Sequence, residues 1–113
     1  MTQTDDCIFC KIINHEIPST KMYETENVYA FADLNPQAKV HALVVPKTHV
    51  KDVTELADKD PQLLAEMIRV AHTIAQETYN GQFRAVFNTG EDAGQTVFHC
   101  HMHVMTGEKL EGE

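Results

Sequence analysis

The sequence predicts a single α+β domain with five short strands, one long helix and one short N-terminal helix. Five segments separated by turn residues are interpreted as strands. Between the third and the fourth of them, apolar residues recur every three or four positions, which is typical of an amphipathic helix. The chain has 113 residues and is 42% hydrophobic, which suits one domain with one core.

The N-terminal part of the chain predicts a short helix and a β-hairpin. Apolar residues near 8–13 suggest the helix, and Pro18 lies at the end of that segment. Residues 21–24 and 28–32 are expected to form two strands around a turn at 25–27.

The middle of the chain contains the clearest signals. Residues 41–45 are expected to form a strand that Pro46 closes, and the apolar run within it, 42–45, predicts a buried, central position. Asp60 and Pro61 form a typical helix start, with Asp60 as the N-cap and Pro61 in the first turn. We expect this long helix to end at 80–81, an Asn-Gly pair.

The C-terminal part predicts two strands, at 83–88 and at 99–105. The loop between them, 89–96, contains two glycines. Glycine allows main-chain N–H groups to approach a phosphate closely, although such a loop is more often a simple turn. We expect an ordered core over about 7–105 and a mobile tail over 106–113.

Three histidines alternate with apolar residues in the last predicted strand. They are His99, His101 and His103, with Cys100, Met102 and Val104 following each in turn. Alternation in a strand directs all three imidazoles to one face. One such histidine would be unremarkable, but a fold has no structural reason to bury three polar groups in register. From the strand alone, the middle histidine is either a nucleophile oriented by its neighbours or one ligand of a catalytic zinc.

Cys7 and Cys10 have a C-x-x-C spacing, which is typical of metal and redox sites. No strand precedes Cys7, so a thioredoxin-like site is not indicated. The pair is either half of a tetrahedral metal site or two buried thiols. His49 and His99 are candidate partners, but the spacing does not show that they come close.

Charge and composition restrict the classes of partner. The formal net charge is −8 and basic residues form no run, which argues against a protein that grips nucleic acid but not against one that binds a single nucleotide. Residues 1–6 do not resemble a signal peptide, and no apolar run is long enough to span a membrane. Three cysteines fit a reducing compartment, so we expect a cytoplasmic protein.

Taken together, these motifs resemble the histidine triad superfamily. The run 99–105 matches the pattern His-φ-His-φ-His-φ-φ, where φ is an apolar residue. The resemblance covers residues 7 to about 105 and includes further matches at 12–18, 31–38, 41–47, 88–90 and 94–96. The pattern is closer to the Hint-type branch, the histidine triad nucleotide-binding proteins, than to the dinucleotide polyphosphate hydrolases.

The resemblance implies a fold, an activity and a set of residues. The implied fold is a five-stranded antiparallel sheet, usually in a homodimer. The implied ligand is a purine nucleoside monophosphate such as AMP or GMP, and the substrate is a nucleoside phosphoramidate or a related nucleotidyl compound. His101 matches the nucleophile that forms a nucleotidyl-histidine, and His103 and His41 match the other active-site histidines. The matching nucleotide contacts are Asp33, Leu34, Asn88, Gly94, Gln95, Thr96, His101 and His103.

Two of these positions also have ordinary explanations. Asp33 precedes Asn-Pro, where an Asx turn is common, and His41 at a strand start could be structural. Thr96 replaces the serine of many relatives but keeps the hydroxyl. The short tail lacks the aromatic and proline residues of some relatives, so the sequence leaves the leaving group undetermined.

The resemblance also implies one structural zinc, held by Cys7, Cys10, His49 and His99. This ligand set conflicts with strict alternation, which would direct His99 to the same face as His101. Both statements hold if the regular strand begins after His99. Three hypotheses follow: a nucleotidyl-histidine enzyme, a nucleotide-binding regulatory module with incidental turnover, and a zinc hydrolase that uses the triad as ligands.

Overall fold

A computed structural model describes residues 6–112 and contains one five-stranded antiparallel sheet. The sheet order is β1-β2-β3-β5-β4. The elements in chain order are α1 (Ile8–Ile13), β1 (Lys21–Glu24), β2 (Val28–Ala32), β3 (Val40–Pro46), α2 (Val53–Lys59), α3 (Pro61–Thr78), β4 (Arg84–Val86), the 3-10 helix η1 (Glu91–Ala93) and β5 (Met102–Thr106). This α+β architecture confirms the predicted fold class.

The central position of β3 is confirmed. It pairs with β2 on one side and with β5 on the other, and its residues from His41 onward are buried. The register places His41 opposite Met105 and Leu43 opposite His103. The strand that begins with His41 therefore lies beside the strand that carries His103.

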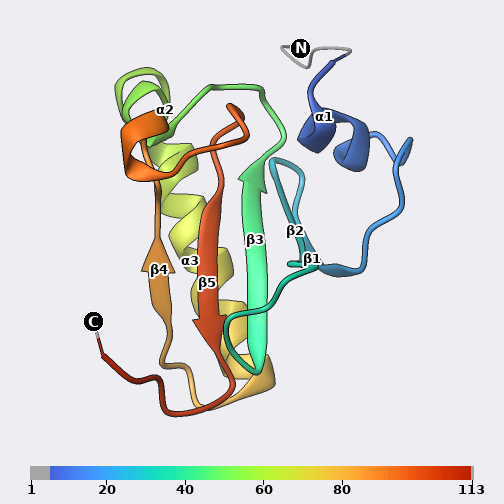
Figure 1. Cartoon of the computed structure of the whole chain (residues 1–113). Coiled ribbons are helices and arrows are strands. Elements are labelled where there is room, and N and C mark those ends of the chain that lie inside the picture. Colours follow the sequence, from blue (N-terminus) through green and yellow to red (C-terminus); the bar gives the residue numbers. More distant parts are fainter. Residues whose placement is uncertain (1–5, 113) are drawn as a thin grey trace.

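The two faces of the sheet pack differently. Ala42 and Val44 of β3 and Met102 and Val104 of β5 face α3 in the main core. The opposite face packs Leu43 and Val45 against α1, in a second apolar cluster. Figure 1 shows α3 running behind β3, β5 and β4, and α1 on the other side of the sheet, next to β2.

Capping residues explain the helix boundaries. Asp60 accepts a hydrogen bond from the amide of Leu63 at the start of α3, as predicted. Gly81 has a positive φ of 88° and lies just after the helix end. The prediction omitted α2, because its seven residues bury only Leu56 and give no periodic signal. Asp52, which accepts from the amide of Glu55, was the available signal.

The last two strands differ from their predicted limits. β4 is shorter than 83–88, and β5 begins at Met102 rather than at His99. The approach to β5 is irregular because the amide of Cys100 donates to the carbonyl of Val50, outside the sheet. The regular strand therefore does begin after His99.

The tail after β5 contacts the body of the domain. The Arg84 guanidinium donates to the carbonyls of Glu111 and Gly112, and a Glu108 carboxylate oxygen accepts from the amide of Lys39. Thr106, predicted to be in the tail, is the last residue of β5. Among residues 6–112, no helix is long and apolar enough to cross a membrane.

Candidate functional site

Three histidines gather on the sheet face that α3 does not cover. His41 comes from β3, His103 from β5, and His101 from the residue before β5. The Nε2 atom of His41 lies 2.9 Å from Nδ1 of His103, and the ring centroids of His101 and His103 are 5.3 Å apart. The structure thus confirms that His101 and His103 share a face, while Met102 and Val104 are buried in the core.

The protonation of His101 follows from one hydrogen bond. Its Nδ1 atom lies 2.9 Å from the carbonyl oxygen of His99. A carbonyl can only accept, so Nδ1 carries the proton and Nε2 keeps a free lone pair. Burial lowers the pKa of His101, against the raising effects of this hydrogen bond and of Asp33. The ring is therefore neutral at pH 7 and has the tautomer that a nucleophile needs.

A second chain of hydrogen bonds fixes His41 and His103. The amide of Gln37 donates to Nδ1 of His41 at 2.9 Å, so the proton of neutral His41 is on Nε2. That proton is donated to Nδ1 of His103. Neutral His103 therefore carries its own proton on Nε2. The pair leaves His103 as an N–H donor, a property that its sequence position alone does not reveal.

Asp33 lies at the end of this chain. Its Oδ2 atom is 3.4 Å from Nε2 of His41 and 3.8 Å from Nδ1 of His103, and its Oδ1 atom accepts from the amide of Asn35. The Asx-turn interpretation is thus confirmed, and the carboxylate also faces the histidines. Burial is the main cause that lowers the pKa of His103, and the charges of His101 and His41 add to it, while Asp33 opposes them.

Asp33, His41 and His103, but not His101, line one open cavity of about 400 Å³. It is lined by Asp33, Asn35, Gln37, His41, Val86, Asn88, His103 and Met105. Within residues 6–112, the Asn88 side chain has no hydrogen-bond partner, so its amide is available to a ligand. Leu34 is 95% exposed and does not line this cavity. The structure therefore groups Asp33, Asn88, His41 and His103 but leaves Leu34 at the surface.

The loop over residues 89–96, here called the predicted phosphate loop, contains residues with different surroundings. Gly90 and Gly94 have positive φ values of 92° and 96°, which glycine adopts without strain. Gln95 is buried, and among the described residues its side chain bonds only to main-chain groups. Thr96 is exposed and lines another cavity, of about 460 Å³, together with Cys7, Ile8 and His49. In this structure Thr96 therefore does not share a cavity with Asn88.

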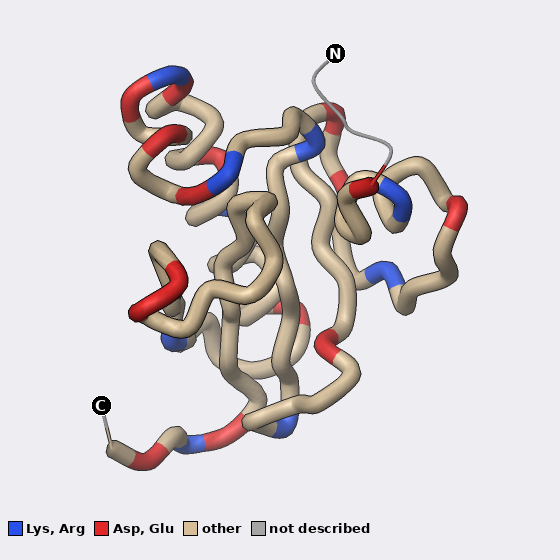
Figure 2. The backbone as a smooth tube through the Cα atoms, turned by 45° about the horizontal axis from the view of Figure 1, so that its top comes forward, with Lys and Arg blue, Asp and Glu red and all other residues tan. Residues whose placement is uncertain are grey.

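The surroundings of the loop contain few positive charges. Figure 2 shows lysine and arginine residues scattered singly over the fold. The 3-10 helix η1, within the loop, contributes the acidic residues Glu91 and Asp92. A phosphate here would depend on main-chain amides, on Asn88 and on imidazole N–H groups. Such donors suit a single phosphate better than a polyphosphate.

Cys7, Cys10, His49 and His99 form a compact group, here called the Cys/His cluster. Their ligand atoms all lie within 4.8 Å of one another. Nδ1 of His99 is 3.3 Å from the Cys7 sulfur and 3.5 Å from the Cys10 sulfur, and Nδ1 of His49 is 3.4 Å from the Cys10 sulfur. His49, between β3 and α2, and His99, just before β5, thus lie close to the C-x-x-C pair. The spacing of these residues in the sequence did not show this proximity.

The donor set of this cluster fits a tetrahedral zinc. Zinc bonds of about 2.3 Å to sulfur and about 2.0 Å to nitrogen separate neighbouring ligands by about 3.3–3.8 Å. The three sulfur–nitrogen distances fall in that range. Nε2 of His99 lies 2.8 Å from the carbonyl of Pro46 and so carries the proton, which leaves Nδ1 free for a metal. Burial lowers the pKa of His99 to about 4, so the ring is neutral.

A second group, Asp33, His41 and His103, also brings ligand atoms close together. Here the tautomer opposes metal binding. Nδ1 of His41 accepts the Gln37 amide, so Nε2 holds the proton at the position that a metal would need. If that proton moved to Nδ1 of His41, it would face the amide N–H of Gln37, and two donors would oppose each other. The proton positions that favour the Cys/His cluster as a metal site therefore disfavour the group of Asp33, His41 and His103.

Comparison with known proteins agrees with this geometry. A family model described as "Scavenger mRNA decapping enzyme C-term binding" matches residues 6–112. The chain is 44% identical over 102 residues to Protein hit of Bacillus subtilis. The aligned region covers 89% of this chain and 70% of that protein. The chain is 39% identical to Protein HitA of Neisseria gonorrhoeae, over 89% of this chain and 95% of that protein.

The chain belongs to the histidine triad superfamily.

Solved histidine triad structures resemble it over nearly the full length. A histidine triad protein from Clostridium difficile is 45% identical, with a TM-score of 0.91 over 99% of both chains. A HIT family hydrolase from Clostridium thermocellum is 39% identical, with a TM-score of 0.90 over 98% of both chains.

Some residues of this histidine triad site escaped the sequence analysis. Phe9 lies between the two cysteines, and its ring centroid is 5.0 Å from that of His101 and 6.0 Å from that of His99. The only sequence signal was its place inside the C-x-x-C motif. Gln37 acts through its main-chain amide, for which residue type gives no signal.

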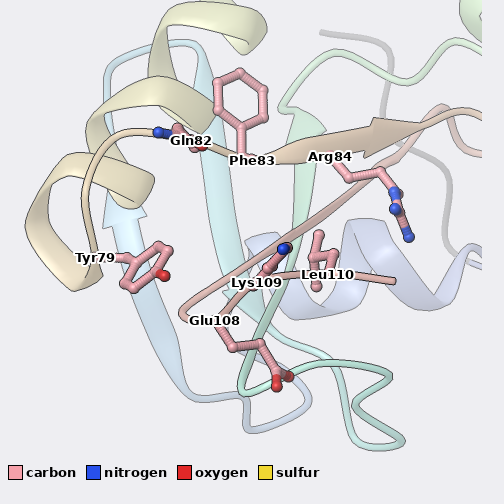
Figure 3. A pocket seen from close by; sticks show the side chains of 7 residues that line it. All are labelled: Tyr79, Gln82, Phe83, Arg84, Glu108, Lys109 and Leu110. Carbon is pink, nitrogen blue, oxygen red and sulfur yellow. The ribbon is translucent and has the colours of Figure 1, made fainter. Parts of the chain in front are cut away.

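Another cavity lies away from the histidines. It measures about 440 Å³, and Figure 3 shows that its side chains come from the end of α3, the start of β4 and the tail. None of the predicted site residues lines it.

Proposed function

We propose that this protein is a Hint-type nucleotide-binding hydrolase that cleaves purine nucleoside phosphoramidates, or related nucleotidyl compounds, to a nucleoside monophosphate. The observation that carries the proposal is the hydrogen bond from Nδ1 of His101 to the carbonyl of His99. It leaves an unprotonated Nε2 on a neutral imidazole that borders His103. Few structural roles for a half-buried histidine require that arrangement.

In the proposed reaction, Nε2 of His101 attacks the α-phosphorus and forms a nitrogen–phosphorus bond. The bond from phosphorus to the leaving amine breaks, and the amine takes up a proton. Water then displaces His101 and gives the nucleoside monophosphate. Two displacements replace one difficult step, and imidazole is a good leaving group for the second.

Neighbouring groups would stabilise the phosphorus centre. We assign Nε2–H of His103 and the Asn88 amide as donors to the phosphate oxygens, because charge that develops there must be met by preorganised donors. Asp33 would accept from a ribose hydroxyl while it orients the two histidines. We retain Leu34, Gly94 and Thr96 as proposed contacts to the nucleotide.

The proposal is tested by trapping the covalent intermediate. The protein is mixed with adenosine phosphoramidate labelled at the α-phosphorus and quenched in alkali, where a phosphohistidine-type bond survives. We expect label on His101 by peptide mass spectrometry, and none in His101→Ala. A protein that binds AMP but never acquires label would favour the alternative, a regulatory module with incidental turnover.

Two further features belong to the proposed state of the protein. Zinc in the Cys/His cluster would tie α1 to the β3–α2 connection and to the β5 approach, and its four protein ligands would leave no position for a reacting water. The thiolates that it needs are consistent with a cytoplasmic location.

We also propose a homodimer, as the resemblance implies. Its structural support is that β4 is an edge strand with one partner, β5, so its outer hydrogen-bonding groups can pair with another chain. Val70 of α3 is buried in the core of the protomer and is not available for this contact. Sedimentation equilibrium measures the molecular mass directly.

A further inference from the structure

We propose that Gln95 is a positioning residue that holds the predicted phosphate loop in place, rather than a ligand of the nucleotide. This inference rests on the proposed function and changes the role that the family resemblance implied for Gln95. The evidence is the hydrogen bonding of the Gln95 side chain, its burial, and the segments that it joins.

All of the polar atoms of the Gln95 side chain face main-chain partners. Its Oε1 atom accepts from the amide of Gly90 at 2.8 Å. Its Nε2 atom donates to the carbonyl of Lys51 at 2.7 Å and to the carbonyl of Val97 at 3.1 Å. An NH₂ group has two hydrogens, so both are used. The side chain is 3% exposed and has no donor left for a phosphate.

These bonds close the loop on itself. The amides of Ala93 and Gln95 both donate to the carbonyl of Gly90, while the Gly90 amide donates to the Gln95 side chain. Gly90 has φ 92° and ψ 156°, a conformation open in practice only to glycine. Such a conformation persists only when its surroundings determine it, and here Gln95 supplies two of the bonds that do so.

The same side chain joins the loop to the segment that follows β3. Lys51 is two residues after His49, and the neighbouring carbonyl of Val50 accepts from the amide of Cys100. Pro46, at the end of β3, accepts from His99. Gln95 therefore fixes the phosphate loop to the frame that also carries two members of the Cys/His cluster.

The surroundings of the neighbouring residues support this division of roles. The Asn88 side chain and the Thr96 hydroxyl have no hydrogen-bond partner within residues 6–112, and each lines a cavity. Those two side chains can turn to a ligand without breaking a bond in the protein. Gln95 could do so only by breaking its three part-buried hydrogen bonds to main-chain groups, which is costly.

The inference is tested on the full-length protein with three variants. Gln95→Met keeps the length of the side chain and removes its polar atoms. Gln95→Glu keeps the acceptor for the Gly90 amide but presents a second oxygen to the carbonyls of Lys51 and Val97. Gln62→Met is the matched control, because Gln62 is exposed on α3, away from the loop. Amide exchange of Gly90, affinity for AMP, KM and kcat are measured for each.

We expect Gln95→Met to speed the exchange of the Gly90 amide and to raise KM, each by about tenfold, with a smaller change in kcat. Gln95→Glu should raise KM similarly and also speed Gly90 exchange, since its two donors are lost. Gln62→Met should change neither. These exchange measurements need no nucleotide, and they report directly on the loop.

A weaker affinity for AMP in Gln95→Met with unchanged Gly90 exchange would overturn the inference, because it would identify Gln95 as a ligand. Unchanged exchange and unchanged KM would overturn it as well. Failure of the proposed function would look different, since the wild-type protein would then neither bind AMP nor become labelled on His101.

Discussion

His99 and His101 are linked by a hydrogen bond from Nδ1 of His101 to the main-chain oxygen of His99, 2.9 Å long. The imidazole of His99 faces the other way, toward the sulfurs of Cys7 and Cys10. One residue therefore fixes the tautomer of the proposed nucleophile with its main chain and joins the Cys/His cluster with its side chain. The cluster and the site of the proposed chemistry are thus adjacent but distinct, and separate variants can test them.

Replacement of the proposed nucleophile should abolish the chemistry and leave the fold intact. We expect His101→Ala to lower the turnover of adenosine phosphoramidate by several orders of magnitude, because no other group replaces a covalent nucleophile. Steady-state turnover and circular dichroism are the measurements. His72→Ala, at an exposed position on α3, is the control and should retain both. Wild-type turnover in His101→Ala would refute the assignment.

Removal of the two cluster thiols should release the metal and lower stability. We expect the double variant Cys7→Ser, Cys10→Ser to lose the one zinc ion proposed for each chain and to melt at a lower temperature, while the proposed chemistry at His101 largely survives at low temperature. Elemental analysis, thermal melting and turnover are compared. Cys100→Ala is the control, since Cys100 is buried in the core outside the cluster and burial raises its pKa to about 12.

The zinc content decides this second prediction. Cys100→Ala should keep its zinc although it loses some stability. An unchanged zinc content in the double variant would rule out the cluster as the metal site. A folded double variant without any turnover would instead indicate a catalytic metal.

The phosphate should supply much of the affinity for a nucleotide. We expect AMP or GMP to bind more tightly than the free nucleoside, and Asn88→Ala to weaken binding of AMP by about tenfold while binding of adenosine changes little. Isothermal titration calorimetry measures both ligands. Equal affinity of the wild-type protein for adenosine and AMP would remove the phosphate-binding role from this part of the molecule.

Titration of His103 should show the effect of its surroundings. Its pKa lies below the ordinary value of 6.5, chiefly because of burial, and Asp33 raises it. We therefore expect the His103 ring to titrate below pH 6.5 in an NMR titration, and at a still lower pH in Asp33→Asn. A higher pKa in Asp33→Asn would contradict the proposed arrangement of the carboxylate.

The lowered pKa of His103 also determines how this residue makes the stability of the protein depend on pH. The folded state binds this proton less readily than the unfolded state does. The contribution of neutral His103 to the free energy of unfolding is therefore complete above pH 6.5 and declines as the pH falls below that value. Comparison of the wild-type protein with His103→Gln by thermal melting across pH isolates this contribution.

The elements that the sequence predicted are those with local causes. The Asp60 cap and the apolar period of α3 act within a few residues, and the apolar run of β3 reports its own burial. The row of histidines was recognisable for the same reason, because alternation in a strand needs no other part of the chain. The helix α2 was missed because seven residues with one buried side chain carry too little pattern.

Other features depended on partners far away in the sequence. His99 leaves the row because the main chain of Cys100 bonds to Val50, and its ring meets thiols that lie about ninety residues earlier in the chain. The proton positions of His41 and His103 follow from the amide of Gln37, which any residue except proline would provide.

The sequence by itself thus determined the five strands, the short N-terminal helix and the long helix, the two chemical groups of residues and the superfamily. Only the tertiary structure decided which nitrogen of each histidine carries a proton, which group can take a metal, and whether Gln95 faces a ligand or the main chain. The physical reason is that periodicity and capping act between neighbours along the chain. A hydrogen bond to a main-chain carbonyl depends instead on where a distant segment is folded, and residue type leaves no trace of it.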